Sequence, residues 1–324
     1  MELKAKTETI TDVEVRLARA EDKEAVLAIC QQTWQHSSDF LPLGWNKWLA
    51  DPNSRVFVVE VDSLPIGILG FVLMSEREAW YQGLRVAPHY RQQGLGLHLL
   101  LTLEQHIERF FVETNINVLR YSTCSSNVFI DKYSKWQRRQ KVGRYFPYKA
   151  DSLNSPVKQL LHLDIDDFDS AWALVTSSNL FTRESYLYLN DPTKWQELTC
   201  EQLKNHLNEG RVWGLKRGNE MFALAIQMPV HTIDYLEGVN EALWKGAHQT
   251  LWLGYANGTD EGLTTLLREL RSFAYCKGYL AVGGMFPISD RIFESLDIAG
   301  YQRAEELEYW VYEWQTQNVS DKSL

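Results

Sequence analysis

The chain has 324 residues and a mass of 37.6 kDa, which is long for one compact domain and typical of two domains of about 150 residues. Hydrophobic residues make up 45 % and charged residues 23 %, and these values exclude a disordered, a collagen-like or a membrane-embedded chain. The net charge of −9 falls mostly on the second half, and an acidic chain without a basic stripe argues against a nucleic-acid partner.

The sequence also predicts where the protein resides. No apolar run approaches the ~18 residues of a spanning helix, and the N-terminus lacks the apolar core of a secretory signal. We therefore expect a cytoplasmic protein without a membrane partner. Its cysteines lie far apart without a CxxC or Cys/His cluster, so we expect no disulfide framework and no metal site, and we interpret all of them as buried thiols. These cysteines are Cys30, Cys124, Cys200 and Cys276.

Hydrophobic patterning in the first half predicts strands separated by helices. The predicted strands cover residues 13–18, 54–62, 66–75, 78–86, 116–124 and 142–148. The predicted helices cover residues 20–34, 94–114 and 127–139. Three antiparallel strands thus lead into a strand, a turn, a helix and a parallel neighbour strand. This order differs from the regular alternation of a doubly wound dinucleotide fold.

The second half repeats this order in weaker form. Its predicted helices cover residues 164–179, 261–278 and 289–300. Its predicted strands form a hairpin over 209–228 and continue at 249–257, 279–286 and 307–314. Such a long period indicates domain duplication. We therefore predict a mixed α/β, α+β-like fold with domains at 1–150 and 151–324, each a mostly antiparallel mixed sheet flanked by helices.

The strongest local motif is LRVAPHYRQQGLG at residues 84–96. The predicted strand ends at Val86, Pro88 forces a turn, and Arg91, Gly94 and Gly96 begin an apolar helix. Amides in the first turn of a helix have no intrahelical partner, and the helix dipole adds positive potential. Glycines let a diphosphate approach the backbone. The motif therefore predicts an anion-binding turn.

This R-x-x-G-x-G turn resembles motif A of the GNAT superfamily, the acetyl-CoA-dependent N-acetyltransferases. The strand order resembles the GNAT fold over residues 13–148, and over 164–314 by element order only. The resemblance implies tandem GNAT-type domains with a splayed central strand. Residues 1–150 would form the catalytic domain, which transfers acetyl directly through a ternary complex. Residues 151–324 would form a degenerate domain that shapes the acceptor pocket or supplies packing surface.

The resemblance also implies the residues that hold acetyl-CoA. The amides of the glycine turn would hold the diphosphate, and the strand edge from Leu84 to Val86 would pair with pantetheine. The amide of Leu84 would donate to the thioester carbonyl. The cofactor-binding residues implied in this way are Leu84, Val86, Arg91, Gln92, Gln93, Gly94, Leu95, Gly96, Leu97 and Asn127.

The sequence departs from the family pattern at the general acid. Asn127 fits the start of the family's last helix, but Ser134 stands where the family carries tyrosine, and Tyr133 precedes it. Tyr133 would either protonate the departing thiolate or pack. Arg138 and Arg139 replace the family's Gly-Phe pair, and a solvated basic face is favoured for them over a phosphate contact.

The attacking amine must lose a proton to a general base, for which Glu76, Glu78 and His89 are candidates. Glu78 has the same side-chain parity as Gln82 and Leu84, and Gln82 would orient water or substrate. The predicted catalytic residues are Glu78, Leu84 and Tyr133. In the second half, Asp260 and Glu261 stand at the start of the corresponding helix and oppose a diphosphate. Coenzyme A is therefore expected to bind once, in the first half.

A narrower resemblance rests on three segments, DFLPLGWNKWL (39–49), GLRVAPHYRQQGLG (83–96) and DKYSKWQRRQ (131–140). Together they look like the vertebrate histidine N-acetyltransferase group, which acetylates the α-amino group of a free amino acid. This resemblance implies a small-molecule amine as substrate. Acetylation of a protein N-terminus or lysine, and a non-catalytic acyl-CoA-binding sensor, stay open as alternatives. We expect a monomer or a homodimer.

Overall fold

A computed structural model describes residues 13–33, 39, 41–91, 105, 109, 115–124, 136–147, 158–177, 187–191, 194–229 and 250–315. Residue contacts divide the chain into two compact units. Unit 1 comprises residues 1–120, 238–243 and 315–324, and unit 2 comprises residues 121–237 and 244–314.

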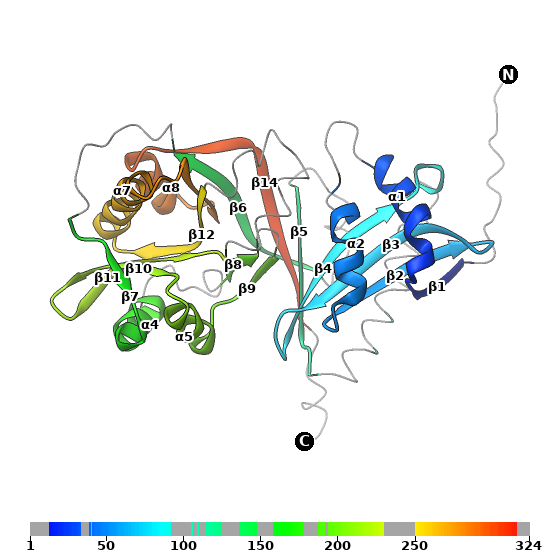
Figure 1. Cartoon of the computed structure of the whole chain (residues 1–324), viewed down its shortest axis with the longest axis horizontal. Helices are drawn as coiled ribbons and strands as arrows, with labels where there is room; N and C mark the ends of the chain where they lie inside the picture. Colours follow the sequence, from blue (N-terminus) through cyan, green and yellow to red (C-terminus); the bar gives the residue numbers. More distant parts are fainter. Residues whose placement is uncertain are drawn as a thin grey trace. The chain divides into compact units, whose positions relative to one another are not determined.

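Unit 1 is built on a mostly antiparallel sheet (Figure 1). Its strands lie in the order β1 (Val13–Leu17), β2 (Ser54–Val61), β3 (Leu64–Leu73), β4 (Glu78–Val86) and β5 (Val118–Cys124), of which residues 118–120 belong to unit 1. Pairing is antiparallel from β1 to β4 and parallel between β4 and β5. The β2–β3 hairpin turns at Asp62 and Ser63, with φ angles of 50° and 64°. Positive φ at both turn residues is what a two-residue type I′ hairpin requires.

Two helices cover one face of the unit 1 sheet, α1 (Lys23–Gln31) and α2 (Leu41–Ala50) (Figure 1). Their apolar side chains meet those of β2 and β3 in a buried cluster. Its members are Val26, Cys30, Leu41, Trp45, Val56, Val58 and Ile68. Val56 and Val58 are two positions apart, so both face the helices, as the alternation of a strand requires.

Unit 2 contains a longer sheet and a small second one. The long sheet has the order β14 (Tyr301–Gln315), β6 (Gln137–Pro147), β13 (Ala281–Pro287), β12 (Thr250–Gly258), β11 (Glu220–Gln227), β10 (Val212–Arg217) and β7 (Leu161–Leu163). The small sheet pairs β8 (Leu187–Asp191) with β9 (Lys194–Glu197).

Helices cover both faces of the unit 2 sheet. Helices α7 (Asp260–Cys276) and α8 (Asp290–Ile298) pack on one face, and α4 (Phe168–Ser177) and α5 (Cys200–Asn208) on the other (Figure 1). Strand β11 shows the alternation. Ala223 and Ala225 contact the α7 side, whereas Leu224 and Ile226 contact the α4 side. Both faces of this strand are therefore buried.

The two halves share one pairing pattern, as the sequence predicts. The strands β7, β10, β11 and β12 pair antiparallel in succession, and β12 then pairs in parallel with β13. In the first half, strands β1 to β4 also pair antiparallel in succession, and β4 pairs in parallel with β5. These observations confirm the predicted mixed α/β fold, in which helices flank each sheet.

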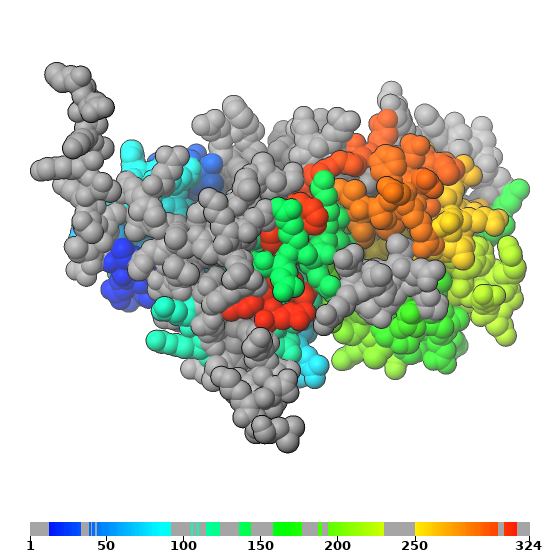
Figure 2. Space-filling view, turned by 180° about the vertical axis from the view of Figure 1, so that it is seen from behind, coloured from blue at the N-terminus to red at the C-terminus, as the bar shows by residue number. Residues whose placement is uncertain are grey.

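Strand β6 departs from the sequence-based prediction. We predicted a helix over 127–139 and a closing strand over 142–148, but residues 137–147 form one strand, and 127–135 lie outside the described residues. The strand pairs with β14 on one side and with β13 on the other. Two hydrogen-bonded ladders outweigh local helix propensity. Figure 2 shows β6 in green beside the red residues of β14.

The pairing of β6 bears on the organisation of the chain. Unit 2 begins at Tyr121, and β6 pairs with strands of the second half. The predicted domains at 1–150 and 151–324 stay a prediction. The catalytic role of residues 1–150 and the degenerate role of residues 151–324 stay predictions.

The expectation of four buried thiols is wrong for two cysteines. Cys30 is buried, but Cys200 and Cys276 are exposed. Cys200 is the first residue of α5 and Cys276 the last residue of α7, and helix ends are open to solvent. The Cys124 side chain lies outside the described residues. Among the helices that the structure describes, none combines the length and apolar character of a bilayer span.

Candidate functional site

Strand β4 contains a β-bulge close to its C-terminal end. Gln82 pairs with Gly70 of β3 and Arg85 with Ile68, so β4 has one residue more than β3 between these pairs. Gly83 lies in this interval with a φ of +77°. A positive φ is readily adopted only by glycine, and bulges of this kind redirect the residues that follow.

Helix α2 packs directly on the bulge. A Cβ atom at position 83 would lie 2.8 Å from the indole of Trp48 and 3.4 Å from Cδ1 of Leu41. Two independent features therefore require glycine here, the backbone conformation and the lack of space. The sequence carried a signal for this site, because an isolated glycine inside a predicted strand often marks a bulge. The sequence-based reasoning did not use that signal.

The ladder between β4 and β5 is short. It pairs Glu78 with Val118, Ala79 with Leu119 and Trp80 with Arg120. Past Trp80, β4 continues to Val86 without a further pair in this ladder, and the bulge interrupts the ladder to β3. Leu84 and Val86 are half-buried. The described part of β4 thus has a strand edge where the splay was predicted.

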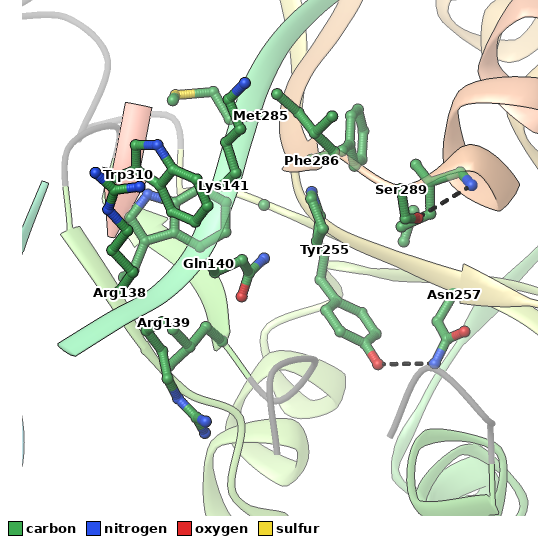
Figure 3. A pocket seen from close by; sticks show the side chains of 17 residues that line it. Arg138, Arg139, Gln140, Lys141, Tyr255, Asn257, Met285, Phe286, Ser289 and Trp310 are labelled. Carbon is green, nitrogen blue, oxygen red and sulfur yellow. Dashed lines mark hydrogen bonds between the residues drawn. The ribbon is translucent and has the colours of Figure 1, made fainter. Parts of the chain in front are cut away.

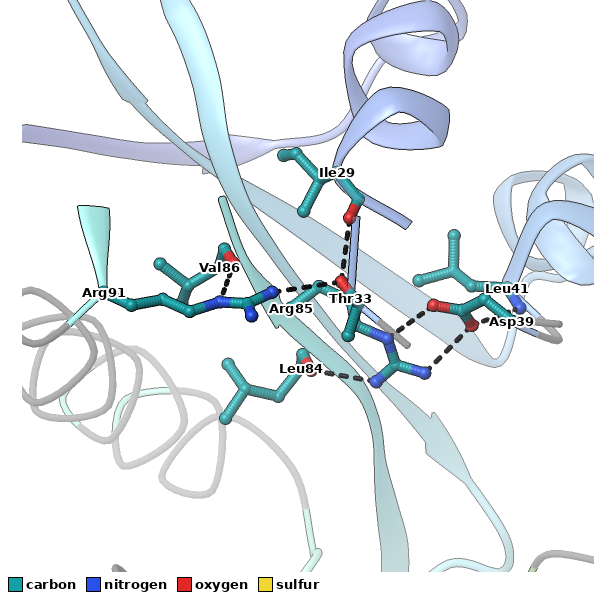
Figure 4. Close-up of polar contacts among 8 residues, drawn as sticks. All are labelled: Ile29, Thr33, Asp39, Leu41, Leu84, Arg85, Val86 and Arg91. Carbon is teal, nitrogen blue, oxygen red and sulfur yellow. Dashed lines mark hydrogen bonds and ion pairs between the residues drawn. The ribbon is translucent and has the colours of Figure 1, made fainter. Parts of the chain in front are cut away.

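A buried ion pair anchors this edge (Figure 4). Arg85 donates from Nε and Nη2 to the two carboxylate oxygens of Asp39, at 2.7 Å and 2.9 Å. Asp39 also accepts from the amide of Leu41 at the start of α2. The remaining Arg85 nitrogen, Nη1, donates to the carbonyl of Leu84 at 2.9 Å. A bidentate pair is geometrically specific, so it holds the guanidinium against the carbonyl of the peptide group between Leu84 and Arg85. The sequence-based reasoning missed this pair.

Arg91 closes the turn after β4 (Figure 4). A short 3-10 turn covers Pro88–Tyr90, and the amide of Arg91 donates to the carbonyl of Pro88. The Arg91 guanidinium donates to the carbonyl of Val86 at 2.8 Å and to the hydroxyl of Thr33 at 3.4 Å. Arg91 therefore fixes the turn from which the predicted anion-binding segment starts.

Several predicted site residues lie outside the described residues. These are Gln92, Gln93, Gly94, Leu95, Gly96, Leu97, Asn127, Tyr133 and Ser134. Their roles stay predictions.

The candidate bases occupy different surroundings. Glu78 is 6 % exposed, and its Oε1 accepts from Nη1 of Arg120 at 2.5 Å, an arginine that is 1 % exposed. Gln82 is also buried, whereas Glu76 and His89 are exposed. The bulge ends the simple alternation of β4 at Gln82, so the parity that we expected Leu84 to share with Glu78 does not carry through.

Arg138 and Arg139, which we predicted at the end of a helix, lie on β6 in unit 2. The Arg138 guanidinium lies 5.0 Å from the centroid of the Trp310 ring, and Nε of Arg139 lies 3.5 Å from a carboxylate oxygen of Glu313. These residues are part of a strand rather than of the predicted helix.

The first turn of α7 in unit 2 is capped by a side chain and carries acidic residues. The hydroxyl of Thr259 accepts from the amide of Gly262 at 3.1 Å. Asp260 forms an ion pair with Arg291, which also donates to the carbonyl of Gly258. The helix start that corresponds to the predicted anion-binding turn is therefore capped and acidic. Within the described ranges, no group of histidine, cysteine and acidic residues has the geometry of a metal site.

A family model matches part of the sequence, and solved structures resemble the fold. Residues 20–124 match the model of the acetyltransferase (GNAT) family. No curated protein matches the sequence. The fold is that of solved acetyltransferases.

Three solved structures illustrate this similarity. A GCN5-related N-acetyltransferase from Sphaerobacter thermophilus is 12 % identical, with a TM-score of 0.57 over 95 % of this chain and 97 % of that one. A tandem GNAT protein from the clavulanic acid biosynthesis pathway is 13 % identical, with a TM-score of 0.52 over 93 % and 98 %. A GNAT-family acetyltransferase from Colwellia psychrerythraea is 10 % identical, with a TM-score of 0.50 over 94 % and 100 %.

Proposed function

Starting from the family match, which supports a place in the GNAT acetyltransferase superfamily and indicates an acyltransferase, we propose a specific reaction. The chain transfers acetyl from acetyl-CoA to a primary amine of a small molecule. The acceptor class that we favour is the α-amino group of an amino acid such as histidine. Transfer is direct, within a ternary complex.

The observation that carries the proposal is the interrupted edge of β4. The β3 ladder is interrupted at the bulge, and the β5 ladder ends at Trp80. An unpaired strand edge accepts an extended ligand by β-strand addition, which suits the amide groups of pantetheine. The residues present therefore fit acetyl-CoA. When bound, acetyl-CoA supplies the acetyl group and a thiolate leaving group.

The chain's own residues would then act in four roles. The turn from Arg91 to Leu97, with Asn127, would hold the diphosphate. The amide of Leu84, which follows the bulge glycine Gly83, would donate to the carbonyl oxygen on which charge develops. Tyr133 would give a proton to the thiolate, and Glu78 would take one from the amine.

A screen of amines tests the proposal. The full chain is mixed with acetyl-CoA and with each of the twenty amino acids, common polyamines, and peptides with free or blocked N-termini. Thiol release is then recorded. We expect fastest turnover with a free amino acid, with histidine the first candidate.

The other outcomes contradict the proposal in distinct ways. Faster acetylation of a peptide N-terminus or lysine would favour the protein-modifying alternative. Acetyl-CoA binding without turnover for any amine would favour the sensor. The proposal also includes a cytoplasmic location and a monomeric or homodimeric state.

A further inference from the structure

Unit 2 contains a cavity of about 520 Å³ between β12, β13 and β6 (Figure 3). Strands β12 and β13 pair in parallel from Thr250–Ala281 to Leu253–Gly284. The cavity begins where this ladder ends, with Gly254 to Asn257 on one wall and Met285 to Ile288 on the other. Its volume lies within the range of small-molecule sites.

A β-bulge at Gly254 shapes the wall of the cavity. Tyr255 pairs with Ile226 of β11 and Leu253 with Gln227, so Gly254 is an extra residue. The carbonyl of Leu189 in β8 occupies the place where a Cβ of Gly254 would lie. Strand β8 therefore packs closely against the bulge. By element order, the bulge and the end of the parallel ladder correspond to those of β4 in unit 1.

Strand β6 supplies positive charge to the cavity. Val311 pairs with Gln140 and Tyr312 with Arg138, so Arg139 is an extra residue in β6. Because a bulge disturbs the alternation of a strand, all four residues from Arg138 to Lys141 line the cavity. Three of them are cations, and no lining residue in the described part of the chain is a carboxylate.

Carboxylates of β14 form ion pairs with two of these cations. Lys141 forms an ion pair with Glu308 at 2.5 Å, and Arg303 shares that glutamate. Arg139 lies 3.5 Å from Glu313. The Arg138 guanidinium lies on the Trp310 ring. A lining with three cations and, among the described residues, no carboxylate favours an anionic ligand.

Gln140 is the second independent sign of a ligand. It is 6 % exposed, and neither Nε2 nor Oε1 has a hydrogen-bond partner among the described residues. The neighbouring Asn257 differs, because it donates to the hydroxyl of Tyr255 and accepts from the amide of Gly258. Figure 3 shows the Gln140 amide directed from β6 toward Tyr255. An unsatisfied buried amide is costly, so a partner for both of its atoms is expected.

The chemistry of the lining defines the ligand. A carboxylate would meet the cations. A secondary amide presents one acceptor and one donor, which match Nε2 and Oε1 of Gln140. Trp195, Phe286 and Ile292 would surround an apolar or aromatic side chain. The capped, acidic start of α7 opposes the diphosphate of a second coenzyme A.

We propose that this cavity binds a small molecule of the N-acyl amino acid class, with a carboxylate beside a secondary amide and an apolar or aromatic side chain. The residues that line this cavity differ from those of the acetyl-CoA site predicted at residues 91–97. N-Acyl amino acids are also the product class of the proposed reaction. If the proposed function holds, the cavity would bind the product of the reaction, and this consequence rests on the proposed function. The proposal that the cavity binds an N-acyl amino acid does not rest on it.

Calorimetry on the full chain without acetyl-CoA tests the binding. The probes are N-acetyl-L-phenylalanine, N-acetyl-L-leucine, N-acetyl-L-methionine and N-acetyl-L-histidine. At least one should bind with a Kd of about 0.1 to 1 mM. Two derivatives of the probe that binds serve as controls. The C-terminal amide lacks the carboxylate, and the free amino acid lacks the acyl amide. Each should bind at least about tenfold more weakly than the probe itself. Absence of binding by all four probes, or equal binding of the amide derivative, would overturn the proposal.

A matched pair of variants on β6 tests the role of Gln140. Gln140→Met keeps the size of the side chain and removes both hydrogen-bonding atoms, so probe binding should weaken by about tenfold or more. Without ligand, this variant should melt about 2–4 °C higher, because a buried unsatisfied amide is removed. Gln137→Met is the control, since Gln137 is exposed and does not line the cavity. It should leave both values unchanged.

The readouts separate this inference from the proposed function. Acetyl-CoA affinity should be the same in both variants and in the wild type. Probe binding without acetyl transfer would refute the function and keep the site. A Gln140→Met chain that melts lower, or that binds the probe as the wild type does, would refute the site whatever the turnover.

Discussion

The buried pair of Glu78 and Arg120 combines a structural role with a predicted catalytic one. Oε1 of Glu78 and Nη1 of Arg120 are 2.5 Å apart, and both side chains are almost fully buried. Removing one member of such a pair takes from the other buried charge its ion-pair partner, which is strongly destabilising. The stability of unit 1 should therefore depend on the Glu78 carboxylate whether or not it also takes the proton of the amine.

We expect Glu78→Gln to lower the free energy of unfolding by about 3–5 kcal/mol, measured by urea denaturation. Glu76→Gln is the matched control, because Glu76 is exposed, and it should change stability by less than about 0.5 kcal/mol. Turnover is measured well below the melting temperature. A turnover of Glu78→Gln within about tenfold of wild type would show that another group is the base.

His206 of α5 makes the stability of unit 2 depend on pH. It is 2 % exposed, and its Nε2 lies 3.0 Å from the hydroxyl of Tyr188. Burial, with a contribution from the charge of Arg211, lowers the pKa of His206 to about 3 from 6.5. Below pH 6.5 the unfolded chain binds a proton that the folded chain does not bind until about pH 3. Stability is therefore lost as the pH falls through this interval.

Between pH 7.5 and pH 5.0 this difference should lower the free energy of unfolding by about 2 kcal/mol. Urea denaturation at the two pH values measures it. In His206→Gln the difference should shrink by about that amount, whatever the stability of the variant at pH 7.5. An unchanged difference would mean that folding does not lower the pKa of His206.

At the scale of elements, the bulge in β4 ties sequence to site geometry. Any other residue at position 83 would be strained, because φ is +77° there. Its Cβ would also lie 2.8 Å from the ring of Trp48. Gly218 has a similar φ of +63°, but no atom lies within 4 Å of its Cβ position. The two glycines therefore separate the cost of the backbone from the cost of crowding.

We predict that Gly218→Ala costs about 1 kcal/mol of stability, the backbone penalty alone. Gly83→Ala should cost about 1–3 kcal/mol more, because Trp48 must move. It should also weaken acetyl-CoA binding, whereas Gly218→Ala should not. Equal losses in the two variants would show that α2 accommodates the side chain and does not set the position of the bulge.

The elements that periodicity predicts well are those with one clear pattern. The segment 78–86 is β4 as predicted, and α7 and β13 lie within two residues of their predicted bounds. Strand β6 could not be predicted, because its conformation depends on two ladders to strands that follow it by more than a hundred residues. The Arg85–Asp39 pair was equally inaccessible, since no pattern in sequence brings position 39 to the end of β4.

At the scale of the whole molecule, the repeat of the fold does not imply a repeat of the site. Both halves have a bulge next to a short parallel ladder. Their helix starts differ in chemistry. The first half offers glycines after Arg91, whereas Thr259 caps α7 and Asp260 and Glu261 follow it. The two halves thus share the pairing pattern of the sheet, whereas the cavity of unit 2 is lined by cations from β6.

This difference predicts one coenzyme A per chain, with the site in the first half. Titration of the full chain with acetyl-CoA should give a stoichiometry near one. Gly94→Glu places a carboxylate in the predicted diphosphate turn and should weaken binding by about 100-fold or more without unfolding the protein. Asn205→Glu, which adds the same charge at an exposed position of α5, should bind as the wild type does. A stoichiometry near two would mean that the acidic start of α7 tolerates a diphosphate. If Gly94→Glu bound one acetyl-CoA with unchanged affinity, the diphosphate would lie elsewhere than at residues 91–97.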